Sequence, residues 1–244
     1  MLEILTDLIS QNLILFYCIV LFSSIVSSSL GIGSFILIPF AAIIYGPKAS
    51  VGIITVYFLV QNINKLIFFK GHANKKIAKI IILWSIPGVL AGSVLLGYLP
   101  AYLFEKILGV AIILFLLNDL HTFISKKQSK KSIPLFGLLY GFFSGLLGSG
   151  NVIKGPLFLS IGLLKESYIA TYALTSFFMN IPKIVIYSWN GVITGDTFVQ
   201  ALPFVFLSFV GTFIGRNVIK RIKSHWFYGI VFIFFIISAM LLIL

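Results

Sequence analysis

Long apolar stretches separated by short polar segments run along the whole chain. Each is long enough for a helix that crosses the hydrocarbon, which takes about 20 apolar residues. The first stretch of each half is interrupted by glycines. The stretches cover 8–45, 49–69, 77–98, 103–123, 134–163, 168–189, 197–219 and 226–244. The pattern predicts an all-α integral membrane protein of two membrane repeats, 1–123 and 134–244, joined by a basic connector at 124–133.

The composition excludes a soluble fold. Hydrophobic residues make up 59% of the 244 positions and charged residues only 10%, whereas a soluble domain carries about 25% charged residues. One core could not hide so much apolar surface, which excludes soluble enzymes, nucleic-acid-binding proteins and disordered tails. The solvent must be a lipid bilayer. The net charge of +12 therefore concerns which membrane face holds the lysines, and no nucleic-acid partner is expected.

The same residues recur in the same order in both halves. The pairs are Gly31/Gly148, Gly33/Gly150, Pro39/Pro156, Lys48/Lys165 and Ser50/Ser167 at an offset of 117 residues, then Asn62/Asn180 and Lys65/Lys183 after a one-residue insertion. Further along, the glycines of 88–92 match those of 211–215. The shared order indicates a duplication, which is typical of secondary transporters.

Charge counting favours re-entrant hairpins for the interrupted stretches. If 134–163 returns to its starting face, twelve loop lysines and arginines lie on the cytoplasmic side and only Lys48 and Lys106 lie outside. A single broken span would give eight against six. Each half is then a broken helical hairpin plus three transmembrane helices, and the halves enter from opposite faces. We expect an inverted repeat in the plasma membrane with both termini outside, although 8–45 is long enough to be partly a full span.

The glycine breaks mark a candidate anion site. Irregular backbone at membrane depth is tolerated only where protein or water satisfies it. Each break also starts a short helix, whose free N–H groups attract an anion. The predicted substrate-binding residues at the breaks are Gly31, Gly33, Ser34, Gly148, Ser149, Gly150 and Asn151. The alternative is that the glycines only allow close helix packing, which is the better interpretation for Gly88/Gly92 and Gly211/Gly215.

Lysines within the spans add positive charge to this candidate site. Lys154 lies three residues past the end of its break, and we expect it to be a counter-charge for the anion unless it pairs with a carboxylate elsewhere. Lys65 and Lys183 either contact the substrate or extend toward the membrane surface. Asn62 and Asn180, one turn earlier on the same helical faces, favour the substrate role.

Acidic and metal-binding side chains are peripheral. The six carboxylates and three histidines all lie in loops or near span ends. The sequence therefore predicts no catalytic residue, no metal and no cofactor.

The two breaks resemble those of a known family. The segments are 31–39, with the sequence GIGSFILIP, and 145–156, with the sequence GLLGSGNVIKGP. They resemble the sulfite exporter TauE/SafE family of multi-pass permeases over about residues 10–240. The resemblance implies transport of a small anionic substrate such as sulfite or a sulfonate, by alternating access between the two broken helices. A membrane-embedded lipid-phosphate enzyme or accessory subunit and an anion channel are the alternatives, and a homo-oligomer is compatible with the sequence.

Overall fold

A computed structural model describes residues 13–31, 33–100, 103, 133–223, 226–227 and 229. The expected span at 103–123 apart from residue 103, the connector at 124–133 apart from residue 133, and nearly all of the last span lie outside the described residues. The described part consists of helices, turns and loops and has no strand.

Eight helices make up the described part of the fold. They are α2 (Leu13–Leu30), α3 (Ser34–Tyr45), α4 (Pro47–Phe68), α5 (Lys75–Tyr98), α7 (Ile133–Leu147), α8 (Asn151–Ser160), α9 (Lys165–Trp189) and α10 (Gly195–Arg221). Among them α2, α4, α5, α9 and α10 are long and apolar enough to cross a membrane. The predicted all-α membrane fold is confirmed.

A glycine turn divides each of the stretches 8–45 and 134–163 into two helices, as expected. Gly31 and Gly148 have φ angles of 84° and 77°, a left-handed conformation that glycine adopts without steric cost. After each turn the chain folds back along the preceding helix. The Ser23 hydroxyl donates to the Gly33 carbonyl at 2.7 Å, and a Cβ on Gly150 would lie 2.4 Å from the Tyr140 carbonyl oxygen. The pairs α2–α3 and α7–α8 are therefore helical hairpins.

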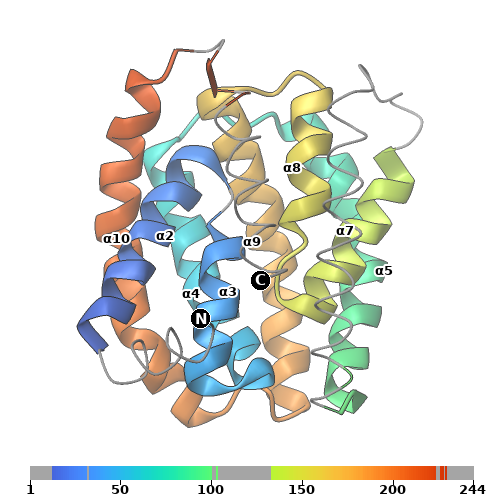
Figure 1. The fold of residues 1–244 in the computed structure, drawn as a ribbon. Coiled ribbons are helices and arrows are strands. Elements are labelled where there is room, and N and C mark those ends of the chain that lie inside the picture. Colours follow the sequence, from blue (N-terminus) through green and yellow to red (C-terminus); the bar gives the residue numbers. More distant parts are fainter. Residues whose placement is uncertain are drawn as a thin grey trace.

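The two hairpins open toward opposite ends of the molecule (Figure 1). One buried apolar cluster contains both open ends of the first hairpin, with Phe16 and Ala41, together with the second hairpin's tip at Leu147. The other cluster contains Ile133 from the start of α7 and the first hairpin's tip at Leu30. The hairpins thus pass each other in the interior.

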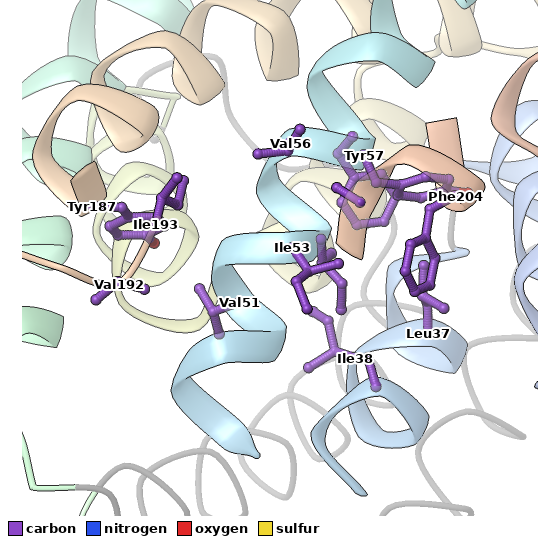
Figure 2. Packing of buried hydrophobic residues seen from close by; sticks show 14 of the residues in the cluster. Leu37, Ile38, Val51, Ile53, Val56, Tyr57, Tyr187, Val192, Ile193 and Phe204 are labelled. Atoms are coloured by element: carbon purple, nitrogen blue, oxygen red, sulfur yellow. The ribbon is translucent and has the colours of Figure 1, made fainter. Parts of the chain in front are cut away.

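The α4 helix runs through the first of these clusters. Figure 2 shows Leu37 of α3 and Phe204 of α10 on one side of α4, and Tyr187 and Val192 on the other. Burial of such side chains contributes roughly 1.5–3 kcal/mol each in water, but lipid is as apolar as they are. Close packing between helices therefore holds the bundle together.

Glycine pairs bring the helices close. A Cβ on Gly88 would lie 2.2 Å from the Leu138 carbonyl oxygen of α7, and one on Gly211 would lie 2.3 Å from the Ser24 hydroxyl of α2. Gly92 and Gly215 approach the same two helices, with a Cβ 2.1 Å from the Phe142 carbonyl oxygen and 2.8 Å from the Ile25 carbonyl oxygen. The packing interpretation of these four glycines is confirmed.

Candidate anion-binding site

A small polar cavity lies where the two hairpins meet α4 and α9. The space open to the centre of a water molecule is about 20 Å³, which is room for about one water. The lining residues come from α2, α4, α7, the second break, α8 and α9: Ser27, Phe58, Asn62, Lys65, Tyr140, Ser144, Gly148, Ser149, Asn151, Tyr172, Ser176, Asn180 and Lys183.

Seven of the residues predicted from sequence line this cavity. They are Asn62, Lys65, Gly148, Ser149, Asn151, Asn180 and Lys183. The matched pairs from α4 and α9 thus meet in one place. Gly31, Gly33, Gly150 and Lys154 are not in the described lining, and the side chain of Ser34 lies outside the described residues.

Lys65 and Lys183 place two ammonium groups at the cavity. Each side chain is only 2% exposed, so neither extends to the molecular surface as the snorkelling alternative required. Lys65 Nζ donates to the Ser27 hydroxyl at 2.7 Å, and Lys183 Nζ donates to the Gly148 carbonyl at 2.8 Å. An ammonium group has three N–H donors, so each retains donors for a ligand.

Two further donors at the cavity are buried without a partner. The amide nitrogen of Asn180 and the hydroxyl of Tyr172 have no hydrogen-bond partner among the described residues, and both residues line the cavity. A buried donor left unpaired costs about 1–3 kcal/mol. Such groups are rare in native structures and need an explanation. A ligand in the cavity would supply the missing acceptor.

Lys154 lies behind the cavity wall. Its side chain is fully buried, and its Nζ donates to the hydroxyls of Tyr140 at 2.9 Å and Thr175 at 3.2 Å. It also donates to the Ser176 hydroxyl and to the Tyr172 carbonyl. Among the described residues, Lys154 has no carboxylate partner. The charge that was expected to contact the anion directly instead contacts residues that do line the cavity.

The two breaks contribute unequally to the site. The second break supplies Gly148, Ser149 and Asn151, and Asn151 begins α8. The first break passes beyond the cavity, because a Cβ on Gly31 would lie 2.7 Å from the ring of Tyr168 at the start of α9. Its hairpin reaches the cavity through Ser27 on α2.

Sequence reasoning missed six lining residues. Ser27 and Ser144 each precede a break glycine by four residues and recur at the offset of 117 residues, so the repeat alone could have found them. Phe58, Tyr140, Tyr172 and Ser176 carry no such signal. In a chain with 16% aromatic residues, single tyrosines look like ordinary core positions.

The arrangement defines a class of protein. Among the described residues, no group of three or more histidine, cysteine, aspartate or glutamate side chains could hold a metal ion. A multi-pass helical membrane protein with an internal cationic cavity has the features of a transporter of small anions.

The family model of the sulfite exporter TauE/SafE family matches residues 16–242, and the chain belongs to this family. It is therefore a membrane transporter of a family that exports sulfite and other anions, and it is not an enzyme. This excludes the lipid-phosphate enzyme. No curated protein and no solved structure matched the chain.

Proposed function

We propose that this transporter carries a small sulfur oxyanion, such as sulfite or a sulfonate, and binds it between Lys65 and Lys183. The observation that carries this proposal is the meeting of two buried lysines in one cavity that also presents unpartnered donors. A buried charge is strongly destabilising unless it is paired. No described residue of the lining is acidic, so an anionic substrate is the partner that would neutralise these lysines.

Reciprocal contacts between the halves support an inverted repeat. A Cβ on Gly31 would meet Tyr168 at the start of α9, and a Cβ on Gly148 would meet Val51 at the start of α4. The offset of 117 residues relates Gly31 to Gly148 and Val51 to Tyr168, so the two contacts are equivalent. We therefore assign 1–123 and 134–244 as the two repeats and 124–133 as their connector.

This pseudo-symmetry supports alternating access. In a protein of two related halves, rocking one half against the other exposes a central site to each face in turn. The cavity has room for about one water, which is too little for an oxyanion with three or four heavy atoms around its centre. Binding therefore requires the hairpins and α4 or α9 to move apart.

A transport assay tests the proposal against the channel alternative. The purified protein in proteoliposomes should take up labelled sulfite with saturation, and sulfite loaded inside the vesicles should accelerate entry by counter-exchange. A pore would give a flux that rises linearly with concentration and shows no counter-exchange. Vesicles that are as impermeable to sulfite as protein-free vesicles would refute the proposal.

Labelling from outside the cell tests the proposed orientation. On a Cys18→Ser background, which removes the exposed native thiol, a membrane-impermeant maleimide should modify Gly195→Cys at the exposed start of α10. It should not modify Lys76→Cys or Lys223→Cys, both exposed in the basic loops, because positive loops favour the cytoplasm. The opposite labelling pattern would show that the termini lie inside.

A further inference from the structure

The Nζ of Lys154 lies among oxygens and aromatic rings between α7, α8 and α9. It contacts the hydroxyls of Tyr140, Thr175 and Ser176 and the Tyr172 carbonyl. It also lies 3.6 Å from the ring centroid of Tyr172 and 4.5 Å from that of Tyr140. Four oxygens and two ring faces are the environment of an ammonium ion.

An ammonium group only donates hydrogen bonds. Each hydroxyl that touches it must accept, and must direct its own hydrogen elsewhere. Thr175 uses its hydrogen on the carbonyls of Thr171 and Tyr172, at 3.1 and 2.9 Å. Tyr140 and Ser176 both line the cavity, so the hydroxyl hydrogens that they turn away from Lys154 Nζ can point into the cavity.

The other two lysines also occupy acceptors of the cavity wall. Lys65 uses the oxygen of Ser27, whose own hydrogen goes to Gln61 Oε1 at 2.9 Å. Lys183 uses the carbonyl of Gly148. The unpartnered donors of Asn180 and Tyr172 lie on the same cavity. The described wall therefore offers several donors, and its remaining acceptors are neutral amide and hydroxyl oxygens.

We propose that Lys154 is a positioning residue that makes the cavity selective for oxyanions without an acidic hydrogen. Lys154 Nζ donates to one lone pair of each of the Tyr140 and Ser176 hydroxyls, and so turns their hydrogens away from Nζ and toward the cavity. Sulfate, sulfite and sulfonates present only acceptor oxygens to such a wall. An anion that carries an O–H group points this hydrogen at a cavity hydroxyl that is itself a donor. One hydrogen bond between the anion and the wall is then not formed. The inference rests on the proposed function, since it requires an anion in this cavity.

Sulfate and hydrogen phosphate form a matched pair of probes. At about pH 8, above the second pKa of a phosphate group, both are tetrahedral dianions and only phosphate carries a hydrogen. Calorimetric titration of the purified wild type should show sulfate binding about tenfold more tightly, which corresponds to the loss of one hydrogen bond. The amides of Asn62 and Asn180 can accept one O–H group, so a larger ratio is not expected.

Lys154→Met should reduce this preference to about twofold or less, because the released hydroxyls can rotate and accept. Loss of the positive charge weakens both dianions equally, so it cancels in the ratio. Lys154→Arg should retain the preference, since guanidinium is also only a donor. The control Lys79→Met, at an exposed position of α5, should change neither affinity. A purely structural role for Lys154 would lower the melting temperature and leave the ratio unchanged.

Each outcome separates this inference from the proposed function. A wild type that binds both probes equally would overturn the selectivity but not the anion site, whereas a wild type that binds neither these probes nor sulfite would overturn both. An unchanged ratio of sulfate to phosphate affinity in folded Lys154→Met would also overturn the role of Lys154 in selectivity. If Lys154→Met does not fold, Ser176→Ala and Tyr140→Phe replace it. Each removes one donor, so each should narrow the sulfate preference, and an unchanged ratio in both would contradict the inference.

Discussion

Replacing both Lys65 and Lys183 with methionine should weaken sulfite binding by at least about 100-fold. A hydrogen bond to a charged group contributes roughly 1.5–3 kcal/mol, so two such bonds correspond to about 3–6 kcal/mol, or a factor of about 100 to 10,000. Each single substitution should cause a smaller and similar loss, because both lysines contact the same cavity from matched positions. Calorimetric titration of the three purified variants with sulfite measures these losses.

The same double variant should be as stable as the wild type without ligand, or more stable. Each buried ammonium has a single protein acceptor among the described residues, and replacing a poorly paired buried charge by an apolar side chain of similar length is often stabilising. Lys48→Met is the control. Lys48 donates to the Gly97 carbonyl at 3.3 Å, at the far end of α4, so its loss should leave sulfite affinity within about twofold. A double variant that binds sulfite as tightly as the wild type would remove both lysines from the site.

The residues that recur in both halves of the sequence explain why so much of the fold could be predicted. A left-handed turn at membrane depth requires glycine, and Gly31 and Gly148 can be recognised in the sequence as such positions. The matched asparagine–lysine pairs on α4 and α9 point to a common location, because related halves place equivalent residues around one axis. Asn62, Lys65, Asn180 and Lys183 do meet at the cavity.

The direction of the Lys154 side chain could not be predicted from the sequence. Its depth was clear from its distance to the break, but its direction depends on how α8 is rotated against α9. No periodicity fixes that rotation, because nearly all faces of α8 are apolar. The side chain turns toward Thr175 and Ser176. Tyr140, which its Nζ also contacts, carries no sequence signal of a site, so this wall of the cavity could not be predicted.

The sequence predicts Gly33 and Gly150 as substrate-binding residues, but neither is in the described lining of the cavity. A Cβ on Gly33 would lie 2.2 Å from the Ser23 carbonyl oxygen. At Gly150 the corresponding contact is with the Tyr140 carbonyl oxygen. The space is filled by the other arm of each hairpin.

Gly33→Leu and Gly150→Leu should therefore prevent folding rather than only block the site. The nearest contact at each position is a backbone carbonyl oxygen, which cannot rotate away as a flexible side chain can, so a leucine would force the hairpin arms apart. Overpacking typically costs 1–3 kcal/mol, and separation of the arms would expose hairpin backbone that lipid cannot satisfy. Size-exclusion chromatography in detergent should show aggregated protein for both variants. Gly195→Leu is the matched control, because nothing lies within 4 Å of a Cβ at that position, and it should remain monodisperse. A folded Gly150→Leu protein that has lost sulfite binding would instead show that this glycine faces the substrate.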